Sequence, residues 1–184
     1  MSTEASASRE AGLDAALAEA GRIAAARGLT QFVEAQDLEC VAATPAGREI
    51  CLAPDAARAW REMQAAAEKD GVSLVLVSGF RSMARQAEII AAKLAAGELL
   101  GAVLEVCAAP GFSEHHSGRA VDLASEEGPV LQEAFEATPA FWWLTRRAKE
   151  FGFSLSYPPG NAQGYCYEPW HWCYRPRPCT IDAP

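Results

Sequence analysis

The chain has 184 residues, half of them hydrophobic, with a formal net charge of -8 and a sequence pI near 4.9. This length and apolar content suit one compact domain with a single core. The acidic balance argues against nucleic acid as a partner, because proteins that bind the phosphate backbone usually carry a basic surface. No apolar run approaches the ~20 residues of a membrane-spanning helix, so we expect no membrane span.

The hydrophobic periodicity predicts a mixture of helices and short strands. In chain order, the expected helices cover 11–27, 54–69, 83–96 and 138–150, and the expected strands cover 32–41, 49–52, 73–77, 120–123, 153–157 and 170–174. Pro54 suits the first turn of its helix, and Thr138 is a good N-cap. The apolar run over 73–77 is typical of a strand buried on both faces. Because helices and strands do not alternate strictly, the sequence favours an α+β fold with an antiparallel sheet.

Three stretches have no clear periodic pattern. Residues 1–9 are small and polar and are predicted to be disordered, 99–107 is ambiguous, and the tail from Arg175 is expected to be irregular. We therefore divide the chain into an N-terminal tail and helix, residues 1–30, and one domain over residues 31–184.

The sequence points to two different compartments. The first ten residues lack the positive region and the apolar region of a secretory signal, which places the chain as written in the cytoplasm. Six cysteines, an even number in a small domain, permit disulfides of the kind found in the periplasm or cell envelope. Cys40 and Cys51 flank a predicted hairpin in which a cross-strand bridge could form. A disulfide-bonded envelope protein and a reduced cytoplasmic protein both stay open.

All three histidines lie in two short segments, 113–122 (SEHHSGRAVD) and 168–174 (EPWHWCY). Two imidazoles and one carboxylate are the ligand set of a catalytic zinc that keeps an open position for water. His115 and Asp122 are too far apart for one helical turn, but a loop that turns at Gly118 and enters a strand can bring both to one point. His171 would come from a second strand. We therefore predict that His115, Asp122 and His171 bind zinc.

The neighbours of these ligands have predicted roles of their own. Glu168, beside the open position, would act as general base on the attacking water and then as acid toward the leaving amine. His116 is expected to point elsewhere, either supporting the site or facing solvent. Trp170 and Trp172 alternate with the last ligand along the predicted strand, so they should face away from the metal.

These segments resemble a known family. Ser-x-His-x-x-Gly-x-Ala-x-Asp over 113–122, followed by Glu-x-Trp-His over 168–171, is similar to the motifs of zinc D,D-carboxypeptidases and dipeptidases of the VanY and VanX type, the LAS-type metallopeptidases. The segments SGFRS over 78–82 and FGF over 151–153 add to the likeness. The resemblance covers about 53–174. It implies a small α+β domain with a central antiparallel sheet flanked by helices, the hedgehog/D-Ala-D-Ala peptidase-like fold.

The resemblance also implies roles for individual residues. His115, Asp122 and His171 would bind zinc, with Glu168 as the catalytic base. Arg81 would contact the substrate carbonyl and stabilise the developing oxyanion, where a cation is physically suited.

Two further positions match the substrate groove of the family, Ser113 and Gln86. Phe80 stands where many relatives have tyrosine, so a hydroxyl contact at that position is missing. The implied reaction is hydrolysis of the terminal D-Ala-D-Ala bond of a peptidoglycan stem peptide or precursor, which makes the stem peptide the expected partner. The sequence makes no prediction of the oligomeric state.

Alternatives of two kinds stay open. Within enzymes, the chain could cut another peptidoglycan bond, such as an L,D bond or the L-Ala-D-Glu bond. Outside enzymes, it could be a metal-containing cell-wall-binding module without hydrolysis, although binding alone does not require Glu168 and Arg81.

The cysteines offer two weaker alternatives. Cys166, Cys173 and Cys179 with the last histidine could form a cysteine-metal module, but no Cys-x-x-Cys pair is present. Cys107 could act as a nucleophile with His115.

Overall fold

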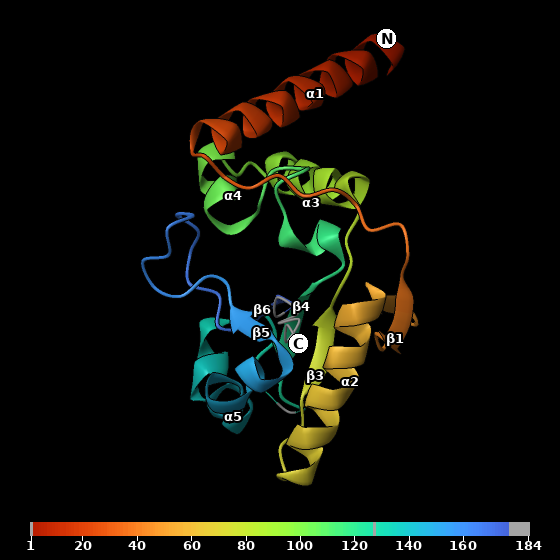
Figure 1. Cartoon of the computed structure of the whole chain (residues 1–184). Coiled ribbons are helices and arrows are strands. Elements are labelled where there is room, and N and C mark those ends of the chain that lie inside the picture. The colour runs from red at the N-terminus through yellow and green to blue at the C-terminus, as the bar shows by residue number, and fades with distance from the viewer. Residues whose placement is uncertain (1, 127, 177–184) are drawn as a thin grey trace, which may run out of the picture.

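We describe a computed structural model of the chain, covering residues 2–126 and 128–176, with side chains described from residue 11 onward. The elements in chain order are α1 (Ser2–Ala26), β1 (Glu39–Ala43), β2 (Glu49–Leu52), α2 (Pro54–Lys69), β3 (Val75–Ser78), α3 (Met83–Ala95), α4 (Leu100–Val106), η1 (Glu114–Ser117), β4 (Ala120–Ala124), η2 (Glu133–Ala137), α5 (Pro139–Arg147), η3 (Ala148–Phe151), β5 (Phe153–Leu155) and β6 (His171–Tyr174). Figure 1 shows their arrangement.

The centre of the fold is a four-stranded antiparallel sheet in the order β3-β4-β6-β5. β4 and β6 are the inner strands, and their register places Asp122 opposite His171. β1 and β2 form a separate antiparallel hairpin beside the sheet. The predicted α+β fold with a central antiparallel sheet is confirmed.

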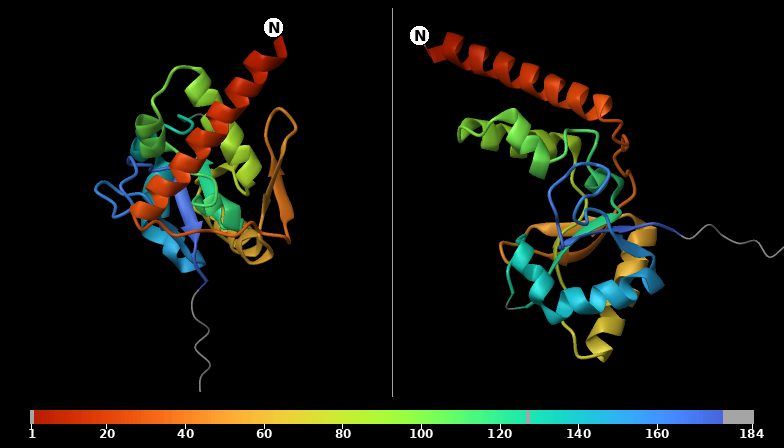
Figure 2. Two further views of the ribbon diagram at one scale, coloured as in Figure 1. Left: turned by 90° about the horizontal axis from the view of Figure 1, so that it is seen from above. Right: turned by 90° about the vertical axis from the view of Figure 1, so that its left-hand side faces the viewer.

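Helices lie on both sides of this sheet. α2 and α5 lie below it in Figure 1, and α3 and α4 lie above it with α1 outermost; Figure 2 shows the same layers from two further directions. The main core is between the sheet and the lower helices, where Trp60 and Met63 of α2 pack with Leu123 of β4 and Trp172 of β6. The upper side of the sheet is therefore available for a functional site.

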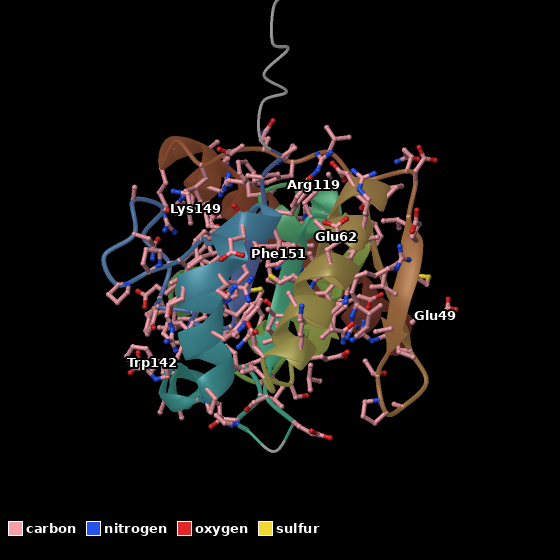
Figure 3. The ribbon with its side chains drawn as sticks, turned by 60° about the horizontal axis from the view of Figure 1, so that its bottom comes forward. Glu49, Glu62, Arg119, Trp142, Lys149 and Phe151 are labelled. Carbon is pink, nitrogen blue, oxygen red and sulfur yellow. A yellow bond between two sulfur atoms is a disulfide. The ribbon has the colours of Figure 1, made fainter. Side chains whose placement is uncertain are left out.

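The lower helices form as their sequences predict. α2 begins with Pro54 and buries one apolar face. The Thr138 hydroxyl accepts a hydrogen bond from the Phe141 N–H and caps α5. Figure 3 shows these two helices side by side, with Glu62 and Trp142 on their outer surfaces. In the part of the chain that the structure describes, no helix is both long and apolar enough to cross a bilayer.

Two predictions for the N-terminal region are wrong. Residues 2–9 belong to α1 instead of being disordered, because no proline interrupts the run and a helix extends easily once it has begun. The segment 32–38 is not part of a strand, since β1 begins at Glu39. The backbone N–H groups of Phe32 and Ala35 instead donate to the carbonyls of Gly111 and His116. This segment therefore lies along the loop that carries the histidine motif.

The predicted strand over 73–77 is displaced and more exposed than expected. β3 is an edge strand, and 37% of the Val75 surface is exposed, so burial on both faces is wrong. An apolar run alone does not reveal whether a strand has one neighbour or two. The ambiguous stretch 99–107 contains α4. The predicted irregular tail beyond Pro176 lies outside the described residues.

The hairpin cysteines are joined as the sequence suggested. Cys40 and Cys51 are register partners in β1 and β2 and form a disulfide. The other cysteines within the described residues, Cys107, Cys166 and Cys173, are free thiols. Cys179 lies outside the described residues.

Candidate active site

Three buried side chains converge on the upper side of the sheet. His115 comes from η1, Asp122 from β4 and His171 from β6, and one ligand atom of each lies within 4.8 Å of the others. All three are at most 4% exposed. Gly118, with φ of 68°, turns the chain from η1 into β4, and an added Cβ would lie 2.8 Å from the Ala53 nitrogen. The predicted turn at this glycine therefore brings the first two residues together.

His115 presents an unprotonated nitrogen to the centre of this cluster. Its Nδ1 lies 2.7 Å from the Gly79 carbonyl oxygen and donates to it, which leaves the lone pair on Nε2. Burial lowers the pKa of His115, so the ring is neutral. Its Nε2 lies 3.2 Å from Oδ2 of Asp122. The Nε2 lone pair of His115 and the Oδ2 of Asp122 thus face each other, and a cation bound between them would stabilise this arrangement.

His171 lies between two carboxylates. Its Nδ1 is 3.1 Å from Oδ1 of Asp122, and its Nε2 is 3.0 Å from Oε2 of Glu114. Burial alone would lower the pKa of His171, but hydrogen bonds to Asp122 and Glu114 outweigh it and raise the pKa to about 10. The ring therefore requires positive charge on its Asp122 side. A proton or a metal cation at Nδ1 satisfies that requirement, with Nε2–H donated to Glu114.

The carboxylates are held in their charged form. Burial opposes ionisation of Asp122, but the two neighbouring histidines, His115 and the hydrogen-bonded His171, keep its pKa far below the usual range. Burial likewise opposes ionisation of Glu114, yet hydrogen bonds from His171 and Ser156 lower its pKa to about 2. Two nitrogen donors and an ionised carboxylate with fixed orientation make a set that fits a divalent metal.

Glu168 lies next to this set without being part of it. Its Oε2 is 3.8 Å from Nδ1 of His171, and 16% of its side chain is exposed. Its backbone N–H donates to the Tyr157 carbonyl, which fixes the residue just before β6. Burial raises the pKa of Glu168 to about 7. A carboxyl group with this pKa exchanges protons readily near neutral pH.

Arg81 supplies a cation beside Asp122. Its Nη2 lies 3.5 Å from Oδ2 of Asp122, and Nη1 donates to Oε1 of Gln86 at 3.1 Å. Gln86 is 1% exposed, and its Nε2 donates to the Ala108 carbonyl at 2.7 Å. Gln86 therefore lies behind Arg81 and holds it, instead of lining the cleft. Ser113 is buried at the cleft wall, and within the described part of the chain its hydroxyl has no hydrogen-bond partner.

His116 is a fully buried structural residue and is not near the metal-binding atoms. The Gly111 N–H donates to its Nε2 at 3.1 Å, so Nδ1 carries the proton and donates to the Arg81 carbonyl at 2.6 Å. It thereby links the Arg81 loop to the turn before η1. The expectation that His116 points elsewhere and supports the site is confirmed, and the alternative of solvent exposure is wrong.

The two tryptophans differ from each other. Trp172 is 4% exposed and packs in the main core, as predicted. Trp170 also packs against this core, as predicted, but it lines the same cleft as His171 as well.

The cysteine alternatives do not match the geometry. Within the described residues, the groups of potential ligands that converge are the histidine–aspartate triad and Cys40 with Glu49 and Cys51. Cys166 and Cys173 do not converge with His171. Both nitrogens of His115 face oxygen atoms, and the Cys107 thiol instead contacts Nε2 of Gln86 at 2.9 Å.

The triad opens into a cleft of about 600 Å³. Its lining includes Tyr157, Tyr165 and Tyr167, together with residues of α3 and of the end of α4. Sequence reasoning missed these tyrosines and also Glu114, although Glu114 stands between two motif residues. The only signal in the sequence for the role of Glu114 is that an acidic residue directly precedes a predicted ligand histidine.

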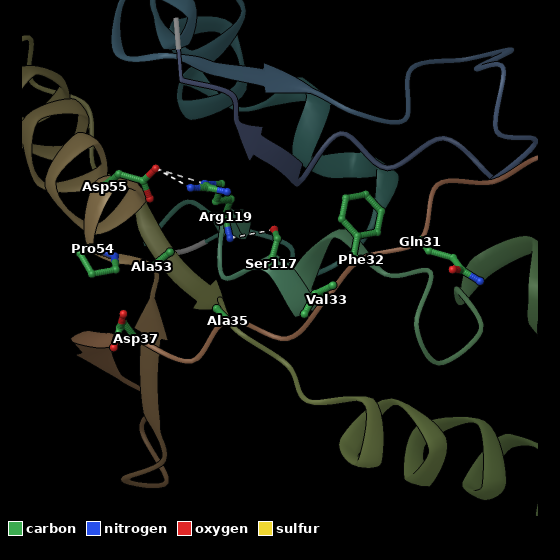
Figure 4. A pocket seen from close by; sticks show the side chains of 10 residues that line it. All are labelled: Gln31, Phe32, Val33, Ala35, Asp37, Ala53, Pro54, Asp55, Ser117 and Arg119. Atoms are coloured by element: carbon green, nitrogen blue, oxygen red, sulfur yellow. Dashed lines mark hydrogen bonds and ion pairs between the residues drawn. The ribbon is translucent and has the colours of Figure 1, made fainter. Parts of the chain in front are cut away.

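A second hollow, of about 590 Å³, lies on another part of the surface between the segment 31–37 and the start of α2. Figure 4 shows that its charged groups are dominated by the ion pair of Asp55 and Arg119, whose Nη2 and Oδ2 are 2.8 Å apart. It contains neither histidine nor cysteine, so the catalytic chemistry belongs to the cleft at the triad.

Known proteins match most of the chain. The family model described as "VanY: D-alanyl-D-alanine carboxypeptidase" matches residues 49–177. YodJ of Bacillus subtilis (strain 168), named as a carboxypeptidase, is 40% identical over 124 residues, which cover 65% of this chain and 45% of YodJ. The chain therefore spans less than half the length of that relative.

Two solved structures share the fold. The LdcB LD-carboxypeptidase is 34% identical with a TM-score of 0.68, and the match covers 77% of this chain and 69% of LdcB. A mutant of a vancomycin-resistance D,D-pentapeptidase VanY in complex with Zn(II) is 29% identical with a TM-score of 0.60, over 77% of this chain and 82% of that one. Since the family model matches well over half of its residues, this chain belongs to the VanY family of D-alanyl-D-alanine carboxypeptidases.

Proposed function

We propose that this chain is a zinc-dependent D,D-carboxypeptidase that removes the terminal D-alanine from peptidoglycan stem peptides or their precursors. The observation that carries the proposal is the buried triad with Glu168 beside His171 and Arg81 beside Asp122. Its family and the Zn(II) complex of a VanY relative support it.

Zinc is the metal that the ligand set favours. Two imidazole nitrogens and one carboxylate oxygen are common ligands of catalytic zinc, which leaves further positions for water and substrate. When bound, zinc would polarise the substrate carbonyl and make water a stronger acid. His115, Asp122 and His171 would hold it, and Glu114 would fix the orientation of His171 through its Nε2–H.

The chain's own residues divide the proton and charge transfers. Glu168 takes a proton from the attacking water and passes it to the leaving amine of D-alanine, since its pKa of about 7 suits both steps. Arg81, held by Gln86, points its guanidinium toward the site where charge develops on the carbonyl oxygen. Ser113 offers its free hydroxyl to the substrate from the cleft wall.

An L,D-carboxypeptidase is the second candidate. The specific observation in its favour is that the LdcB structure has a higher identity and TM-score than the VanY structure. Both reactions release D-alanine, but an L,D enzyme cuts a tetrapeptide after its third residue.

The two candidates are separated by D-alanine release from two stem peptides. We expect the zinc-loaded protein to release D-alanine from a pentapeptide ending in D-Ala-D-Ala at least ~10-fold faster than from the tetrapeptide ending in one D-Ala. Release from the tetrapeptide alone would establish the L,D reaction. No release from either peptide, with zinc measured in the protein, would exclude both candidates.

The metal site itself can be tested through Glu114. We expect Glu114→Gln to lower zinc affinity by roughly 10–100-fold, because the negative charge that accepts the Nε2–H of His171 and orients the ring is lost. Competition with a chromogenic chelator measures this. Glu62→Gln on the outer surface of α2 is the matched control and should bind zinc as the wild type does. Equal zinc affinity in Glu114→Gln would mean that Glu114 does not support the metal.

The Cys40–Cys51 bridge bears on the compartment. We propose that the protein works in the cell envelope, where disulfides persist and peptidoglycan is accessible. Acid-quenched thiol alkylation of protein taken from cells should leave these two cysteines unmodified until a reductant is added. Immediate alkylation of both would place the protein in a reducing compartment.

A further inference from the structure

Arg27 lies outside the residues that match the family model, yet it contacts the wall of the cleft. It directly follows α1, and Figures 1 and 2 show this end of the helix beside α4. The Arg27 guanidinium donates from Nη2 to the Gln163 carbonyl at 2.5 Å and from Nη1 to the Leu104 carbonyl at 3.4 Å. One side chain thus joins α4 to the loop between β5 and β6.

Gly164 makes room for this contact. Its φ is +71°, and a Cβ added there would lie 2.8 Å from Nη2 of Arg27. Gly160, in the same loop, has a φ of +69° and nothing within 4 Å of an added Cβ. The two glycines share the same left-handed backbone, but only Gly164 faces Arg27. The loop is therefore shaped around the guanidinium.

The loop over 158–165 is crosslinked by the side chain of Asn161. The Asn161 Nδ2 donates to the carbonyls of Pro158 and Tyr165, and its Oδ1 accepts from the Tyr165 N–H. One further hydrogen bond, from the Cys166 N–H to the Glu105 carbonyl at 2.8 Å, fixes the loop to α4. Anchoring at Arg27 therefore positions the whole loop.

A series of ring contacts connects Arg27 to the metal-binding cluster. The guanidinium carbon lies 5.4 Å from the centroid of the Tyr165 ring. Tyr165 is 4.9 Å from Tyr157, and Tyr157 is 4.6 Å from the His171 ring, all between centroids. Tyr157, Tyr165 and Tyr167 form the aromatic wall of the cleft. Any displacement of the loop would shift this wall.

We infer that Arg27 is a positioning residue that holds the aromatic wall against α4, and that this wall binds the part of the peptide preceding the scissile bond. The inference rests on the proposed peptidase function. Flat aromatic faces suit peptide planes and aliphatic side chains, which the stem peptide provides. The segment before the matched family region thereby contributes to substrate affinity.

The first test is hydrogen–deuterium exchange of the backbone over 158–168. We expect Arg27→Ala to raise the exchange rate of this loop severalfold, because its anchor is removed. Arg27→Lys should restore part of the protection, since an ammonium group can reach one carbonyl but cannot bridge both as the guanidinium does. Arg22→Ala, which removes only an exposed ion pair with Glu19 on α1, is the matched control and should match the wild type.

The second test compares two substrates. Arg27→Ala should raise KM for the pentapeptide about tenfold, with kcat within about twofold, and leave KM for N-acetyl-D-Ala-D-Ala nearly unchanged, because the short substrate reaches only the end of the wall at Tyr157, beside His171, and not Tyr165 next to Arg27. Gly164→Ala should reproduce this pattern, whereas Gly160→Ala should not.

The outcomes separate this inference from the proposed function. Unchanged exchange in Arg27→Ala would show that Arg27 does not hold the loop. Faster exchange with equal KM changes for both substrates, or with none, would show that the wall does not bind the upstream peptide. If the wild type hydrolyses neither peptide, the proposed function fails. Exchange then still decides the role of Arg27, and calorimetric affinity for the pentapeptide in wild type and Arg27→Ala decides the role of the wall.

Discussion

Replacing Glu168 with glutamine is expected to lower kcat by roughly 10²–10⁴-fold while zinc stays bound. Glutamine keeps the size and much of the polarity of the side chain, but it cannot take a proton from water. Because Glu168 is not one of the converging ligands, metal affinity should change little. Single-turnover release of D-alanine, with zinc measured in the same samples, provides both quantities.

Glu133→Gln is the matched control, since Glu133 is an exposed carboxylate on the same cleft. It should retain nearly the wild-type kcat. If Glu168→Gln kept more than a tenth of the wild-type kcat, another group would have to be the base.

The same carboxyl group sets the pH dependence expected for the wild type. Burial raises the pKa of Glu168 to about 7, and the base must be deprotonated to act. On the acid side, kcat/KM should therefore rise tenfold per pH unit and level off at or below pH 7, because a bound dication favours the carboxylate form.

Removal of the Arg81 guanidinium is the second large effect. We expect Arg81→Ala to lower kcat about 10²–10³-fold with a smaller change in KM, because the cation acts mainly on charge that develops during the reaction. Steady-state kinetics with the pentapeptide measure both parameters. Gln86→Leu should lower kcat in the same direction by about tenfold, since it removes the acceptor that holds Nη1 of Arg81.

Arg85→Ala is the matched control for Arg81. Arg85 lies nearby, in the first turn of α3, and is exposed, where it pairs with Glu88. Its replacement should leave both kinetic parameters within about twofold of the wild type. A loss in Arg81→Ala that appeared only in KM would mean that Arg81 binds the ground state of the substrate and does not stabilise the transition state.

The triad could be predicted from the sequence because its chemistry is rare in this chain. Three histidines in two short segments leave few ways to build a metal site, and both Asp122 and His171 stand in recognisable strands. Period-two alternation sets the face that each residue occupies on its own strand, and the antiparallel register then places Asp122 opposite His171. The fold class could also be predicted, because the order of helices and strands follows from local sequence patterns.

The supporting residues could not be predicted, because their positions depend on contacts between distant segments. Gln86 is held behind the guanidinium of Arg81 by a hydrogen bond to the Ala108 carbonyl, 22 positions away. Glu114 contacts His171 from 57 positions away. The extended segment beginning at Phe32 had the composition of a strand, but its partner is the loop around Gly111 and not another strand.

The direct pairing of Asp122 with His171 has a consequence for biogenesis. A pairing of β4 and β6 displaced by one residue would turn one of the two side chains to the opposite face of the sheet. Only molecules in which β4 and β6 have paired correctly can then bind metal. Metal binding stabilises these molecules relative to the misaligned forms. The supply of metal during maturation would thus set how many newly made chains reach the native register.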